Sequence, residues 1–180
     1  MIGTRQAHDH DQTAGSPSSG ATGGIAAVMS GDLGANDSGV RIRTVAAGDL
    51  TPLIALWREV FPEYNDPQRP QRDPRASIER KLAFGDGLFW VAQIDTQLVG
   101  SAMAGYDGHR GWLYSVGVLP RLRRSGLARA LVTRAEAELA RRGCPKINLQ
   151  VLASNDDGRN FWRALGYVDD AVVSLGKRLG

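Results

Sequence analysis

Three strand-like segments follow one another between residues 88 and 118, and only short turns separate them. The first, 88–94, is rich in aromatic and apolar residues, and 98–106 returns after a turn at 95–97. Turn-forming residues at 107–111 then precede the third segment, 112–118. Short connections force neighbouring strands to pair antiparallel, so these segments predict a β-meander.

Helical and strand-like patterns flank this meander and define the fold class. Beside the meander we expect a strand at 40–45, helices at about 50–60, 75–84 and 126–142, a strand at 146–152, a short helix ending near 165, and a strand at 167–179. Asp49, and Asn155 or Asp156, are the expected N-caps, and four prolines make 62–74 a loop. The order β-α-α-β-β-β-α-β-α-β predicts an α/β domain with a mixed sheet and one right-handed crossover.

Composition changes sharply near Val40. Residues 1–40 hold 8 of the 22 glycines, no aromatic residue, one basic and four acidic residues. Such a segment buries too little apolar surface to offset its ordering entropy, so we expect a disordered tail over 1–39 and one folded domain over 40–180. His8 and His10 in this tail are expected to be solvated, not metal ligands. Met29 is a candidate translation start, which N-terminal sequencing that finds Met1 would reject.

The overall composition excludes several classes of protein. Hydrophobic residues make up 42% of the 180 residues, which is typical of a globular domain. No apolar run approaches the ~20 residues of a membrane helix, and no signal peptide is evident. Cys144 is the single cysteine, so neither a disulfide framework nor a multi-cysteine metal site is possible within the chain. A cytoplasmic protein without membrane association is the expectation.

Basic charge is concentrated in one stretch of the expected domain. The stretch 121–142 holds seven arginines and two glutamates. A basic nucleic-acid binder would show a steep salt dependence of DNA binding. No helix-turn-helix, zinc-finger or aromatic-ribbon pattern accompanies the charge, so we expect no nucleic-acid partner. A small anionic ligand explains a local cluster equally well.

This basic stretch includes the start of a helix after a strand. The first N–H groups of a helix lack partners within it and favour an anion. Gly126 and Ala128 let an oxygen atom approach the backbone closely, and Arg123, Arg124 and Arg129 add positive charge. The P-loop and dinucleotide-binding motifs are both absent. The residues describe a diphosphate cradle, although an ordinary loop with solvated arginines gives the same short spacing.

Two motifs together resemble the GNAT superfamily of N-acetyltransferases. The first, similar to the acyl-CoA motif of that family, is Gly117-Val118-x-Pro120 followed by Arg123-x-x-Gly126-x-Ala128. The second is Asn155, then Phe161-Trp162 and Gly166-Tyr167. Segments 106–111, 142–147 and 175–179 further resemble the bacterial YpeA-like branch. The resemblance covers about residues 40–180 and implies a GNAT-like fold.

The resemblance also implies a set of cofactor-binding residues for acetyl-CoA as cosubstrate, with no metal. The strand 112–118 would carry a bulge and splay from its neighbour, with its backbone pairing with the pantetheine arm. Amides from about Arg124 to Arg129 would hold the diphosphate. Phe161 and Trp162 would line the cofactor wall, or simply pack in the core. The full set is Val116, Gly117, Val118, Arg123, Arg124, Ser125, Gly126, Leu127, Ala128, Arg129, Asn155, Phe161 and Trp162.

The implied reaction is direct attack of an amine on the thioester, with a backbone N–H near Val116 stabilising the oxyanion. Many family members use a catalytic Glu on the strand that matches 112–116, and a Tyr as general acid at the position of Trp162. This chain has neither catalytic group. Tyr106 and Tyr114 are the nearest phenols and the remaining catalytic candidates. Asp66 or a chain of waters could assist the amine.

Two functions remain open. The first is an N-acetyltransferase acting on a small-molecule or protein amine, as a monomer or homodimer. The second is a non-catalytic acyl-CoA-binding sensor or partner-binding module, which the missing acid and base would fit. No motif in 62–74 or 167–180, the segments that set specificity in the family, names the acceptor.

Overall fold

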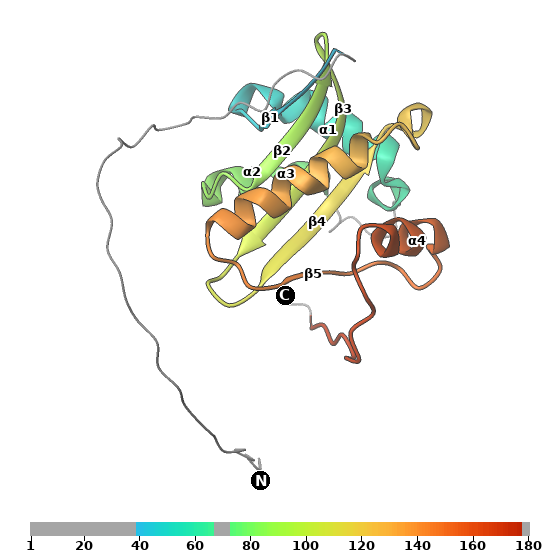
Figure 1. Cartoon of the computed structure of the whole chain (residues 1–180). Coiled ribbons are helices and arrows are strands. Elements are labelled where there is room, and N and C mark those ends of the chain that lie inside the picture. Colours follow the sequence, from blue (N-terminus) through green and yellow to red (C-terminus); the bar gives the residue numbers. More distant parts are fainter. Residues whose placement is uncertain (1–38, 67–72, 178–180) are drawn as a thin grey trace, which may run out of the picture. The chain divides into compact units, whose positions relative to one another are not determined.

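A computed structural model describes residues 39–66 and 73–177 (Figure 1). The expected tail 1–39 falls, except for Gly39, outside the described residues, as do His8, His10 and Met29. The other expected elements can be compared with the structure one by one.

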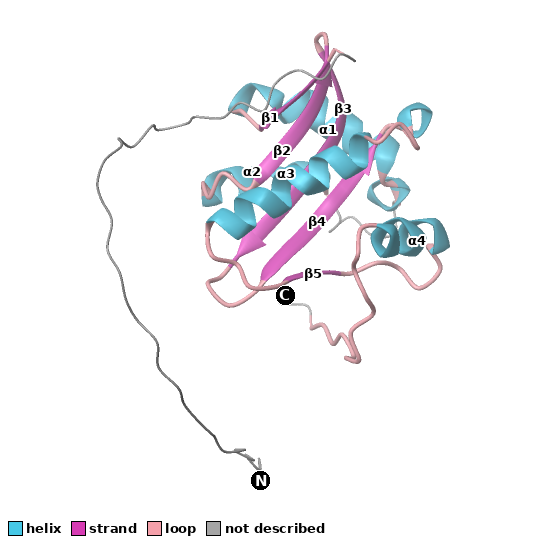
Figure 2. Ribbon diagram, in the orientation of Figure 1, coloured by secondary structure: helices cyan, strands magenta, loops and turns pink. Residues whose placement is uncertain are grey.

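A five-stranded sheet in the order β1-β2-β3-β4-β5 forms the centre of the domain (Figure 2). The strands are β1 (Val40–Thr44), β2 (Phe89–Ile94), β3 (Gln97–Tyr106), β4 (Gly111–Val118) and β5 (Ile147–Leu149). The first four pair antiparallel, and β5 pairs parallel to β4. The expected meander and the mixed sheet are therefore confirmed.

Four α-helices accompany the sheet in the described part of the chain: α1 (Leu50–Val60), α2 (Pro74–Phe84), α3 (Leu127–Arg141) and α4 (Asp156–Ala164). Helix α1 lies on one face of the sheet and α3 crosses the other (Figure 1). Trp57 and Leu53 of α1 and Leu131 and Leu139 of α3 are fully buried against these two faces. Burial of such large apolar side chains stabilises both layers by about 1.5–3 kcal/mol for each side chain.

Asp49 precedes α1 as expected, but its carboxylate does not cap that helix. It accepts from the Ala46 N–H at 2.7 Å and forms a two-pronged ion pair with Arg43 of β1, at 2.6 and 2.8 Å. The hydrogen bond from Arg43 is the largest influence that holds the pKa of Asp49 below its ordinary value. Asp49 thus ties the start of α1 to the edge strand.

The expected last strand, 167–179, does not form over its described part, 167–177. Side chains, not a backbone ladder, hold this segment near β5, as in the ion pair between Lys146 Nζ and Asp170 at 2.6 Å. Alternating apolar residues indicate a strand only where a neighbour offers backbone partners. Four apolar side chains here are between 78% and 91% exposed: Val168, Val172, Val173 and Leu175.

No helix in the described ranges is long and apolar enough to cross a membrane. Within the same ranges, no group of three or more His, Cys, Asp or Glu side chains is placed to hold a metal ion.

Candidate active site at the gap between β4 and β5

Strand β4 carries a β-bulge near its middle. Ser101 of β3 pairs with Gly117, whereas Met103 pairs with Tyr114, so β4 has one extra residue between these pairs. Ser115, within the bulge, adopts a φ of 45°, a left-handed conformation that costs a non-glycine residue about 1–2 kcal/mol. The bulge expected from the family resemblance is present.

A buried hydrogen-bond chain supports this strained residue. The Trp57 Nε1–H group of α1 donates to Ser101 Oγ at 3.0 Å, and the Ser101 hydroxyl donates to the Ser115 carbonyl at 3.4 Å. Gly117 then passes close to α1, because a Cβ there would lie 2.4 Å from Val60 Cγ1. The packing of α1 therefore fixes the path of β4 beyond the bulge.

Strands β4 and β5 separate at the bulge. They pair only from Gly111 and Ile147 to Leu113 and Leu149, which leaves the β5-facing edge of β4 unpaired from Tyr114 onward. A cavity of about 500 Å³, here called the gap cavity, opens where they part. Its lining residues are Phe61, Glu63, Tyr64, Trp112, Leu113, Tyr114, Ser115, Val116, Leu149, Gln150, Val151, Leu152, Asn155 and Trp162.

Beyond the gap, the turn into α3 presents open backbone amides. No described residue accepts a hydrogen bond from the backbone N–H groups of residues 124–129. Arg124 (φ 64°) and Gly126 (φ 85°) are both left-handed, and a Cβ on Gly126 would meet nothing within 4 Å. Arg123, Arg124 and Arg129 have exposed side chains around this turn. The geometry is that of an anion site with room for a phosphate group.

The second motif lies across the gap from β4. Asn155 Oδ1 accepts from the Gly158 N–H at 2.9 Å, so this residue is the N-cap of α4 while it also lines the gap cavity. Trp162 lines the cavity and meets the Phe161 ring edge-on, with centroids 5.0 Å apart. Both rings pack against the core, and Trp162 is the one of the two that also lines the gap cavity.

The two tyrosine candidates lie at different places. Tyr114 lines the gap cavity and is 44% exposed. Burial, and to a smaller degree the charge of Asp107, raises the pKa of the Tyr114 phenol, which therefore stays neutral at physiological pH. Tyr106 pairs with Gly111 at the start of β4, away from the bulge. Its hydroxyl donates to the Gly143 carbonyl at 3.2 Å. It is not among the described residues that line the cavity.

Glu63, which the sequence did not single out, contributes a carboxylate to the gap cavity. It belongs to a short 3-10 helix, Pro62–Asn65, that follows α1. Tyr64 stacks on the buried Trp57 ring at 5.3 Å, which turns this helix toward the sheet. The sequence signal that could have located Glu63 is its position between two aromatic residues just after the amphipathic helix.

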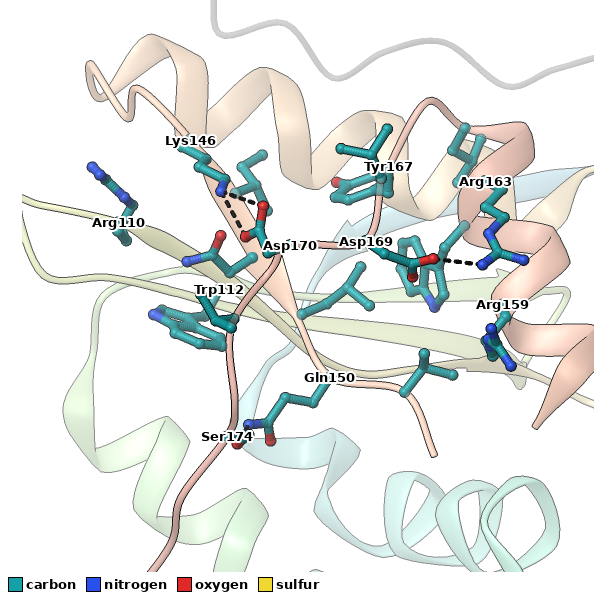
Figure 3. Close-up of a pocket in the computed structure, with 18 of the residues that line it drawn as sticks. Arg110, Trp112, Lys146, Gln150, Arg159, Arg163, Tyr167, Asp169, Asp170 and Ser174 are labelled. Atoms are coloured by element: carbon teal, nitrogen blue, oxygen red, sulfur yellow. Dashed lines mark hydrogen bonds and ion pairs between the residues drawn. The ribbon is translucent and has the colours of Figure 1, made fainter. Parts of the chain in front are cut away.

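A larger groove runs along β5, on the side away from most of the sheet, with a volume of about 1680 Å³. We call it the edge groove (Figure 3). The segment after α4 forms its outer wall through the Lys146–Asp170 ion pair and a second ion pair, Arg163 to Asp169 at 2.5 Å. The edge groove adjoins the gap cavity, because the two share these lining residues: Glu63, Tyr64, Trp112, Leu149, Gln150, Val151, Leu152 and Trp162.

A mixed sheet with a bulged β4, a gap toward a parallel β5, and open amides at the next helix start defines an acyl-CoA-type N-acyltransferase. Residues 53–167 match the model of the acetyltransferase (GNAT) family, and the chain belongs to this family. Family membership confirms the expected activity, acetyl transfer to an amine.

Known proteins support the same assignment. An acetyltransferase of Sodalis glossinidius, SG1711, is 45% identical over 141 residues, which are 78% of this chain and 96% of that protein. Among solved structures, the PaiA N-acetyltransferase of Thermoplasma acidophilum, in complex with coenzyme A, has a TM-score of 0.67 at 19% identity, covering 74% of this chain and 92% of that one. The aminoglycoside N-acetyltransferase AAC(6')-Iy, in complex with CoA, has a TM-score of 0.65 at 23% identity, covering 82% and 100%.

Proposed function

We propose that this acetyltransferase uses acetyl-CoA and binds it across the gap between β4 and the start of α3. The observation that carries the proposal is the run of unpaired amides over 124–129, which follows the end of β4 after the short 3-10 helix Pro120–Leu122. We assign the diphosphate to these amides, with Arg123, Arg124 and Arg129 adding charge-assisted contacts. The space beside Gly126 fits a phosphate group.

The open edge of β4 is the proposed partner of the pantetheine arm. Val116, Gly117 and Val118 have no β5 residue beside them, so their backbone groups on that edge can pair with an extended ligand as an added strand would. When bound, acetyl-CoA supplies a thioester carbonyl open to an amine. We assign the backbone N–H near Val116 to stabilise its oxygen, and Asn155 and Trp162 to the opposite wall.

The acceptor amine is proposed to enter the gap cavity from the side of the 3-10 helix Pro62–Asn65. Tyr114 is the one catalytic candidate of the two tyrosines that reaches this cavity, where its neutral phenol can donate a hydrogen bond. Trp162 offers an indole N–H, which is not an acid at neutral pH. The resemblance of the segments 106–111, 142–147 and 175–179 supports placing the chain in the YpeA-like branch.

Turnover separates this enzyme from a non-catalytic CoA-binding module. We expect thiol release from acetyl-CoA with at least one member of a panel of small-molecule and peptide amines, and no release without amine. Tight CoA binding with no release across the panel would instead support the module.

The diphosphate site is tested by Arg124→Glu. The exposed side chain carries no fold contact that the structure shows, so the variant should fold normally while its CoA affinity falls about a hundredfold through charge reversal. Calorimetric titration with CoA measures the change. Arg80→Glu is the matched control, because Arg80 on α2 is also exposed, and this variant should bind CoA like the wild type. Equal affinities for all three proteins would show that the diphosphate lies elsewhere.

A further inference from the structure

The gap cavity carries negative charge and no positive charge. Glu63 is the single carboxylate among its described lining residues, and none of them is Lys, Arg or His. The turn at 123–129 has the opposite character, with three exposed arginines. The two ends of the proposed site therefore favour ligands of opposite charge.

Glu63 is available to a ligand. It is half-buried, and within the described part of the chain no hydrogen bond or ion pair involves its carboxylate. Its backbone is fixed nevertheless, because Tyr64 stacks on Trp57 and Asn65 Nδ2 donates to the Arg58 carbonyl at 2.7 Å. Because the turn is already ordered, only the side-chain rotamers of Glu63 lose freedom when its carboxylate pairs with a cation.

Aromatic faces complete the surroundings of this carboxylate. Trp112 and Tyr114 stack nearly parallel on one face of β4, with centroids 6.4 Å apart and an interplanar angle of 12°. The negative face of such rings attracts an ammonium group.

Glu63 and Trp112 also line the edge groove, where four basic residues lie: Arg110, Lys146, Arg159 and Arg163. Three of them face carboxylates of their own: Lys146 pairs with Asp170, Arg163 with Asp169, and Arg159 lies 3.5 Å from Asp156. Arg110 comes just before β4, and its Nη1 donates to the His109 carbonyl at 2.9 Å. Figure 3 shows its side chain pointing away from Trp112.

We propose that Glu63 and the stacked pair Trp112–Tyr114 form an acceptor subsite that takes the amine as an organic ammonium ion with an apolar or aromatic stem. The proposal rests on the proposed function and specifies its acceptor: Glu63 pairs with the ammonium, and the ring faces cover its stem. The turn at 123–129 then attracts the anionic cosubstrate, and Glu63 attracts the cationic acceptor, at opposite ends of one gap.

The test compares two probes of nearly equal shape, benzylamine, which is protonated at neutral pH, and benzyl alcohol, which is neutral. Each is titrated into the protein saturated with CoA, with tryptophan fluorescence as the readout. The variants are Glu63→Gln and, as a matched control, Glu59→Gln, whose carboxylate lies on the exposed side of α1 at 3.9 Å from Arg121. CoA affinity and circular dichroism report folding of each variant.

We expect the wild type and Glu59→Gln to bind benzylamine about tenfold more tightly than benzyl alcohol, the order of one half-buried ion pair. Glu63→Gln should lose this preference while its CoA affinity stays unchanged. Equal binding of the two probes by the wild type, no binding of either, or a preference retained in Glu63→Gln would overturn the subsite and leave the proposed function standing. Failure of the wild type to bind CoA would overturn both.

Discussion

Single residues with unusual backbone conformations mark the site. Within twelve positions, Ser115, Arg124 and Gly126 all have positive φ. Only glycine adopts this region without a steric cost, so Ser115 and Arg124 are strained. Ser115 has the hydrogen bond from Ser101, whereas Arg124 has no contact that the structure shows. The strained residues lie where β4 opens and where the diphosphate is proposed to bind.

Gly126→Ala tests the turn at the scale of one residue. At φ 85° an added Cβ strains the backbone by about 1–2 kcal/mol and occupies the space assigned to phosphate, so CoA affinity should fall at least about tenfold. Gly108→Ala is the control, because Gly108 has nearly the same φ of 88° and equal free space in the turn before β4. It should lose similar stability in thermal unfolding and keep its CoA affinity. Identical CoA binding by the two variants would contradict the assignment.

At the scale of elements, β4 and α3 position the site together. Strand β4 is held on one side by α1, through Gly117 and the Trp57–Ser101–Ser115 chain. Helix α3 is fixed at its far end, where Arg142 Nη2 donates to the Asp86 carbonyl at 2.8 Å. The start of α3, which bears the open amides, is thereby oriented by contacts more than four helical turns away.

Glu138, near the end of α3, gives a pH-dependent test of this anchor. Hydrogen bonds from Arg141, together with those from Arg142, lower its pKa from 4.5 to about 2. Because the folded-state pKa is depressed, its contribution is complete above about pH 4.5 and is lost as the pH falls toward 2. Glu138→Gln should lower the free energy of unfolding by about 1 kcal/mol at neutral pH, and this difference should vanish near pH 2.

Denaturant unfolding of both proteins across this pH range measures the difference. Glu79→Gln on α2 is the control, since the exposed Glu79–Arg75 pair at 3.2 Å should contribute less than about 0.5 kcal/mol at any pH. A Glu138 effect that is the same at acid and neutral pH would show that the arginine pairing is not its cause.

For the whole molecule, binding and stability are linked. A ligand that binds only the folded state, at about a hundred times its Kd, adds about 2.7 kcal/mol to the free energy of unfolding. For a domain of this size, CoA should therefore raise the unfolding midpoint by about 5–10 °C. Duplex DNA should cause no rise, although the basic stretch 121–142 resembles a nucleic-acid patch in composition. Differential scanning calorimetry with each ligand makes the comparison. If DNA raised the midpoint and CoA did not, the basic stretch would be assigned to nucleic-acid binding instead.

Much of the fold could be predicted because it depends on local signals. The periodicity of 50–60 and 126–142 and the short turns of the meander correspond to α1, α3 and β2–β4 within one or two residues. Asn155, one of the two expected caps, is the N-cap of α4. These features arise from contacts between residues near in the chain. The strand expected at 167–179 does not form over its described part, because a strand needs a neighbouring strand for its backbone hydrogen bonds, and no local signal shows whether one is present.

The sequence by itself determined the helices, the meander, and the arginine-flanked Gly126 turn, because side-chain spacing and glycine conformation act over a few residues. Only the tertiary structure decided where β4 and β5 part, since a bulge at Ser115 depends on register with β3 and on the buried Trp57. It likewise decided that Glu63 lines the gap cavity and Tyr106 does not, because long-range packing of α1 against the sheet sets which side chains meet.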